Sequence, residues 1–173
     1  LVGRMLQLDP GSRPDSAEVA RALSRYLTGQ AERARRQAEA DALLDQAREH
    51  LMLMREARSH RAQEQNALAI QRTKVPGYAD LVQKRPLWDA EDRVQALTYE
   101  QGEHWLQAAE AASFASTLAP EGNAGRELLA ELWWERMLQA EEEREPVLAS
   151  QARERVARFD TGGYRSLLEG GGT

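Results

Sequence analysis

Residues 40–54, ADALLDQAREHLMLM, decide the fold of this chain. Their apolar side chains recur at alternating steps of four and three residues, which places them along one face of a helix. That face consists of Ala40, Leu44, Ala47, Leu51 and Met54. Its spacing predicts the seam of a coiled coil or a helical hairpin. Residues 51–54 are apolar around more of the helix than one seam needs, so we expect later helices or a partner to cover them.

The sequence around this seam predicts a long helix and an all-α chain. No glycine or proline occurs between residues 30 and 72, and we assign residues 29–75 to one long helix or coiled-coil segment. Of the 173 residues, 42% are hydrophobic, 29% charged and only 6% aromatic, a balance that favours elongated amphipathic helices over a compact sheet. The predicted fold is a long helix packed against antiparallel helical hairpins.

Glycine and proline residues mark the remaining boundaries. Pro76, Gly77 and Pro86 predict an irregular connection over residues 76–88, with Asp89 as the cap of the next helix. Residues 89–161 are assigned to helical hairpins, and residues 162–173 to a C-terminal turn and linker.

Residues 89–122 resemble the tetratricopeptide repeat, a helix–turn–helix unit with small residues where its two helices cross. The matching positions are Ala96, Tyr99, Ala108, Ala115 and Pro120, with Gly102 at the turn. A second unit from Asn123 matches only in its first half. Because a lone repeat cannot bury its apolar face, we expect the long helix to cover it. The expected contacts join Leu44, Leu51, Met54 and Leu68 to Trp105, Leu129 and Trp133.

The first 27 residues carry a second motif. Leu8-Asp9-Pro10-Gly11-Ser12-Arg13-Pro14 forms a turn-rich loop, and Asp15 with Glu18 makes a capping-box pattern at the start of a helix. This arrangement resembles the last subdomain of a eukaryotic-like serine/threonine protein kinase. We therefore assign residues 1–28 to a kinase C-lobe remnant in which Asp9, Pro10, Arg13 and Pro14 are structural motif residues.

The kinase resemblance implies a non-catalytic fragment of a bacterial serine/threonine kinase. In that family the arginine at the position of Arg13 pairs with the glutamate that closes the activation segment. The parent kinase would use ATP and magnesium. This chain lacks the Gly-rich loop, the strand lysine and the catalytic-loop aspartate, so we predict no catalytic, cofactor or metal residues within it. The helical region would then be a spacer or protein-docking platform. The alternative is a free-standing helical scaffold unrelated to kinases.

Charge and composition limit the partners. Residues 1–88 carry 15 basic and 11 acidic side chains, whereas residues 89–173 carry 8 basic and 17 acidic ones. This asymmetry predicts that the basic half docks on the acidic half. The net charge of −5 argues against nucleic acid, and no run is long and apolar enough for a membrane helix. The absence of cysteine and of a signal peptide favours a cytoplasmic protein. The expected partners are other proteins or the kinase catalytic domain itself.

A few residues are candidates for a partner surface. Trp134 is adjacent to Trp133 but points about 100° away on a helix, so it is either partly exposed or part of an interface. Met52 and Met54 either fill the core, the preferred interpretation, or form an adaptable docking surface. The arginines of the long helix either form a solvated face, the preferred interpretation, or bind an anionic ligand. These arginines are Arg48, Arg55, Arg58 and Arg61.

Overall fold

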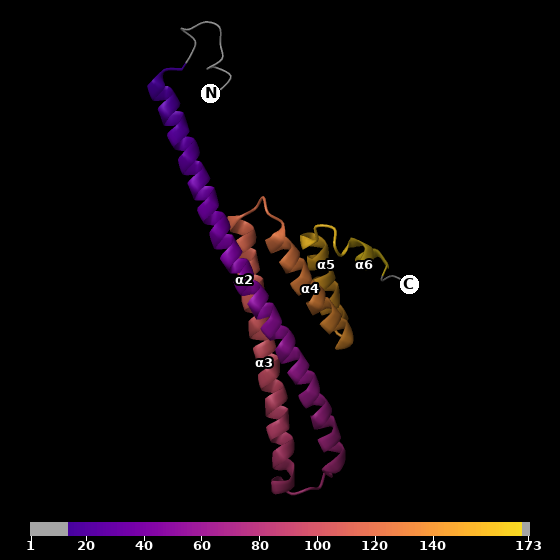
Figure 1. Ribbon diagram of the computed structural model, residues 1–173. Helices are drawn as coiled ribbons and strands as arrows, with labels where there is room; N and C mark the ends of the chain where they lie inside the picture. The colour runs from indigo at the N-terminus through magenta and orange to yellow at the C-terminus, as the bar shows by residue number, and fades with distance from the viewer. Residues whose placement is uncertain (1–13, 171–173) are drawn as a thin grey trace. The chain divides into compact units, whose positions relative to one another are not determined.

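The computed structural model describes residues 14–170, and every regular element in that range is an α-helix (Figure 1). The helices are α2 (Ser16–Lys74), α3 (Leu81–Leu118), α4 (Ala124–Glu142), α5 (Pro146–Phe159) and α6 (Arg165–Gly170). The predicted all-α class is confirmed. Asp9, Pro10 and Arg13 of the kinase-type motif lie outside the described residues.

The chain divides into two compact units, Leu1–Glu39 and Ala40–Thr173, with the boundary inside α2. In the first unit, the backbone N–H of Glu18 donates to Asp15 Oδ1 at 2.6 Å, which confirms Asp15 as the cap of this helix. Large apolar side chains of this unit, Leu23, Tyr26 and Leu27, are exposed.

In the second unit, α3 lies along the later part of α2, and α4 and α5 pack side by side (Figure 1). Two ion pairs join α2 to α3. Arg72 contacts Glu91 at 2.8 Å and Arg93 contacts Glu64 at 3.2 Å. Near the loop between these helices, Lys84 Nζ donates to the carbonyl oxygen of Gly77 at 2.8 Å.

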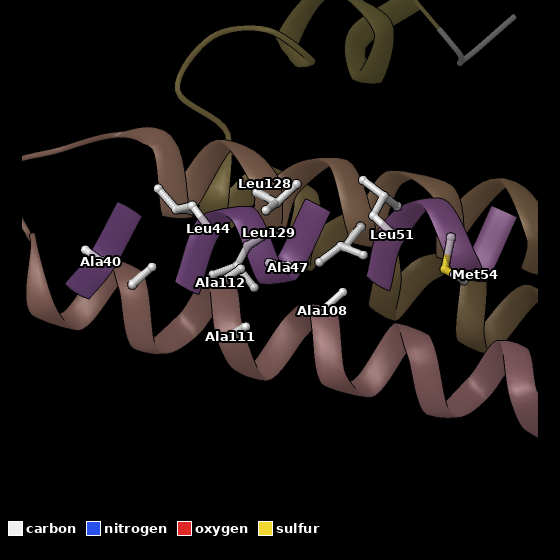
Figure 2. Packing of buried hydrophobic residues seen from close by; sticks show 12 residues of the cluster. Ala40, Leu44, Ala47, Leu51, Met54, Ala108, Ala111, Ala112, Leu128 and Leu129 are labelled. Atoms are coloured by element: carbon white, nitrogen blue, oxygen red, sulfur yellow. The ribbon is translucent and has the colours of Figure 1, made fainter. Parts of the chain in front are cut away.

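The core of this unit forms where α2, α3 and α4 meet. Figure 2 shows the leucines of α2 and α4 packed over small residues of α3. Alanine on α3 leaves room for this close approach, and each leucine buried here contributes about 1.5–3 kcal/mol. The buried cluster comprises Ala40, Leu44, Ala47, Leu51 and Met54 from α2, Ala108, Ala111, Ala112 and Ala115 from α3, and Leu128, Leu129 and Leu132 from α4.

The predicted covering contacts are largely present. Leu44, Leu51 and Met54 share this cluster with Leu129, and Trp105 packs against it. Leu68 is buried but lies outside the cluster. Trp133 is half-buried and meets Trp105 edge-on, with ring centroids 4.9 Å apart.

Polar side chains hold α3 and α4 together at the edge of this core. Gln101 Nε2 donates to Gln139 Oε1 at 2.9 Å, and both side chains are buried. Trp105 Nε1 donates to the carbonyl oxygen of Leu132 at 3.3 Å. A buried amide loses its partner if one helix slides along the other, so the glutamine pair favours a single register.

The irregular connection predicted for residues 76–88 is shorter in the structure. Asp80 Oδ1 accepts from the backbone N–H of Gln83 at 2.8 Å, so α3 begins at Leu81 and the predicted cap Asp89 lies inside it. Pro86 therefore also lies within α3. A proline has no N–H to donate to the carbonyl four residues earlier, which belongs to Val82. Val82 is exposed, so water can bind that oxygen instead.

Two glycines also differ from their predicted roles. The boundary predicted after residue 28 does not end a helix, because α2 continues through Gly29. The repeat-type turn predicted at Gly102 is absent, because α3 is continuous there. A glycine costs a helix only about 1 kcal/mol relative to alanine, so a long helix can continue through one.

Candidate interaction surfaces

A row of ion pairs joins α2 to α4, and we call it the Arg–Glu seam. Arg55 contacts Glu131 at 2.7 Å and also Glu135, to which its Nε donates at 2.6 Å. Further along α2, Arg58 pairs with Glu142 at 2.7 Å and Arg61 pairs with Glu143 at 2.6 Å. The spacing of three residues on α2 keeps these arginines on one side of the helix. The predicted docking of the basic half on the acidic half takes place here.

The contacts of the Arg–Glu seam shift the pKa values of Arg55 and Glu143. Burial lowers the pKa of Arg55, but hydrogen bonds to Glu135 and Glu131 outweigh it, and the pKa lies above its ordinary value. Burial likewise raises the pKa of Glu143, but hydrogen bonds from Gln139 and Arg61 outweigh that, and the pKa lies below its ordinary value. The ionised form of each group is therefore favoured at neutral pH.

The arginines of α2 were predicted either to form a solvated face or to bind an anionic ligand, and their ion pairs bear on this choice. Arg48 pairs with Asp45 within α2 at 2.9 Å, and the other three bind glutamates of α4 or its C-cap residue Glu143. Their charges are matched inside the chain, which argues against the anionic-ligand alternative.

The three predicted partner-surface residues have different surroundings. Met54 is 3% exposed and lies in the core, so it is not part of an exposed surface. The four-and-three spacing of apolar residues that buries Leu51 also buries Met54. Met52 is 58% exposed. Trp134 is half-buried against Tyr164, with ring centroids 5.1 Å apart.

Tyr164 belongs to a turn built between α5 and α6. Asp160 Oδ1 accepts from the backbone N–H groups of Gly162 and Tyr164, both at 3.0 Å, and Gly162 has a φ of 122° that favours glycine. These hydrogen bonds lower the pKa of Asp160. Burial, together with the charges of Glu131 and Glu135, raises the pKa of Tyr164.

An open cavity of about 480 Å³ lies beside this turn. Arg48, Glu127, Glu131 and Asp160 contribute charged groups to its lining, which also includes Tyr164. Thr161 Oγ1 donates to Glu127 Oε1 at 3.1 Å, so polar groups of the lining bind one another. Among the described residues, these lining carboxylates do not form a set of metal ligands.

Sequence reasoning missed a histidine pair between α2 and α3. His50 Nδ1 and His104 Nδ1 lie 3.2 Å apart, and the rings stack with centroids 5.4 Å apart. For these nitrogens to share a hydrogen bond, one ring must donate its N–H while the other accepts. The two residues are 54 positions apart in the sequence, so no local spacing could bring them together.

Sequence reasoning also missed the outer face of α3. Large apolar side chains on it are exposed: Leu81 72%, Trp88 44%, Tyr99 67% and Leu106 61%. The buried face of the same helix consists mainly of alanine. This inversion, with small residues inside and large ones outside, marks the outer face as a candidate contact surface.

Two kinds of feature are absent from residues 14–170. No helix in this range is long and apolar enough to cross a membrane. No group of three or more histidine, cysteine, aspartate or glutamate side chains in the same range could hold a metal ion.

Comparisons with protein-family models, with curated proteins and with solved structures found no match for this chain. The kinase and tetratricopeptide resemblances therefore stay predictions.

Proposed function

We propose that this chain is a non-catalytic part of a bacterial serine/threonine protein kinase, in which the helices after residue 28 act as a spacer or protein-docking platform. The observation that carries the proposal is the motif of residues 8–14 followed at once by a capped helix. The hydrogen bond from Glu18 N–H to Asp15 Oδ1 begins a helix where the kinase pattern requires one. ATP and magnesium would be bound by the catalytic domain.

The docking role is supported by the frame that α2, α3 and α4 build. Ala108 and Ala115, which fall on the small-residue positions of a tetratricopeptide-type pair, are buried in the cluster that α3 shares with α4. Pro120 follows α3 in the turn before α4. In this proposal α4 and the later half of α3 form a repeat-type pair, and α2 takes the place of the neighbouring repeat.

The first test reads the coding sequence immediately upstream of the Leu1 codon. An in-frame catalytic loop and Asp-Phe-Gly motif support the kinase proposal. A stop codon followed by an initiator contradicts it and favours the free-standing scaffold, the second candidate. The continuity of α2 through Gly29 is the observation that favours this scaffold.

The docking role has its own test in the parent kinase. Deleting the codons for residues 40–170 should lower kcat/KM for the protein substrate through a raised KM, because docking contributes binding energy away from the reacting groups. The kcat/KM for a short peptide substrate should not change. An equal loss with both substrates would show that the helices support the catalytic domain instead.

A further inference from the structure

Four of the exposed apolar residues of α3 form a straight stripe, and two others, Val82 and Phe114, lie about 80–120° around the helix from it. Successive residues of a helix are about 100° apart, so Leu81, Trp88, Tyr99 and Leu106 fall within an arc of about 20°. The buried residues of α3, among them Ala90, lie on the opposite side of the helix. The stripe thus takes no part in the core of the second unit.

The spacing of the stripe is palindromic. Its four residues are separated by steps of 7, 11 and 7, which read the same in both directions along the helix. If a second α3 lies antiparallel on the first, Leu81 falls opposite Leu106 and Trp88 falls opposite Tyr99. Each contact then occurs twice about a two-fold axis, as an isologous interface requires.

The charges beside the stripe follow the same symmetry. Arg85 and Glu103 lie on the same flank of it, and in this register Arg85 of one copy falls within one residue, about 1.5 Å along the axis, of Glu103 of the other. This pairing also occurs twice. Within residues 14–170, neither side chain has an ion-pair partner in its own chain. Apolar and charged positions therefore select the same alignment.

We propose that a second copy of this chain binds the outer face of α3, forming an antiparallel dimer centred between Arg93 and Val94. The contact buries the stripe and adds two ion pairs at its rim. It needs neither a kinase domain nor a separate docking partner, so it can fail while the proposed function holds.

The first test is sedimentation equilibrium of the full 173-residue chain and two variants. The wild-type chain should dimerise with rising concentration. Leu106→Glu should weaken the dimer at least about 100-fold, because the substitution removes two buried leucines per dimer. Phe114→Glu is the matched control: Phe114 is 55% exposed on the same helix but lies about 80° around it from Leu106, and the dissociation constant of this variant should equal that of the wild type.

A monomer at every concentration, or a dimer that Leu106→Glu does not weaken, would overturn the proposal. The second outcome would point to another surface, such as the exposed apolar residues of the first unit. Circular dichroism of each variant checks that its helices remain.

The second test addresses the register. Arg85→Glu and Glu103→Arg should each weaken the dimer, because each places like charges beside one another twice. Mixing the two variants should restore association, because every neighbouring pair in the mixed dimer is again opposite in charge. Failure of the mixture to associate better than either variant alone would contradict the antiparallel register.

Discussion

Gly125, in the first turn of α4, lies against the backbone of α3. A Cβ on this residue would lie 2.8 Å from the backbone nitrogen of Ser116 and 3.0 Å from the carbonyl oxygen of Ala112. These are backbone atoms, so a helix must shift to make room. Gly125→Ala should lower the free energy of unfolding by about 1–3 kcal/mol, measured by urea denaturation.

Gly102 provides the control. It is exposed within α3, and a Cβ there would meet no atom within 4 Å. Gly102→Ala should raise the free energy of unfolding by about 0.5–1 kcal/mol, because alanine loses less conformational freedom in a helix. Equal effects of the two substitutions would contradict the close crossing of α3 and α4.

The contact of Arg61 with Glu143 should make stability depend on pH. The folded-state pKa of Glu143 lies below its ordinary value of 4.5, so its contribution is present above that pH and is lost as the pH falls through the folded value. Glu143→Gln should cost about 0.5–1 kcal/mol at pH 7, the upper part of the range for partly exposed pairs. Urea denaturation at pH 7 and at low pH measures the difference. A deficit that is as large in acid would show that the charge is not responsible.

A substitution near the start of α3 should raise the stability of the protein. Pro86 leaves the carbonyl of Val82 without its helical N–H, so Pro86→Ala should raise the free energy of unfolding by about 1–3 kcal/mol. Pro146, at the start of α5, is the control. A backbone N–H at that position would have no helical partner, so Pro146→Ala should lower the same quantity by about 0.4–1 kcal/mol. Thermal unfolding of both variants checks the opposite signs.

The sequence predicted the elements whose signals are local. The four-and-three spacing of residues 40–54 identified the buried face of α2, and Asp15 identified its first turn. Gly29, Gly102 and Pro86 misled, because a long helix tolerates residues that would end a short one. Met54 was predicted both in the seam and on a partner surface, and the structure buries it where the seam spacing places it.

Contacts between distant segments could not be predicted from local patterns. The pairing of Arg55 with Glu131 and Glu135 depends on the register of α4 against α2, which packing across the whole core decides. Charge asymmetry between the two halves predicted attraction, but not which side chains meet. The steps of 7, 11 and 7 on α3 are visible in the sequence, yet only the burial of its alanines shows that this stripe faces outward.

At the scale of the second unit, α2 from Ala40 onward completes a core that α3 and α4 would leave open. α3 contributes alanine to this core, so the large buried side chains come from α2 and α4. The Arg–Glu seam borders the same contact and favours one alignment of α4 on α2. Stability therefore depends on α2, while the outer face of α3 takes no part in the core.

Urea denaturation of two neighbouring α2 variants tests this dependence most directly. Leu51 is 3% exposed within the cluster shared with α3 and α4, whereas Met52 is 58% exposed. Leu51→Ala should lower the free energy of unfolding by about 2–5 kcal/mol, and Met52→Ala should change it by less than about 0.5 kcal/mol. Small and equal effects of both substitutions would show that α2 does not cover the core.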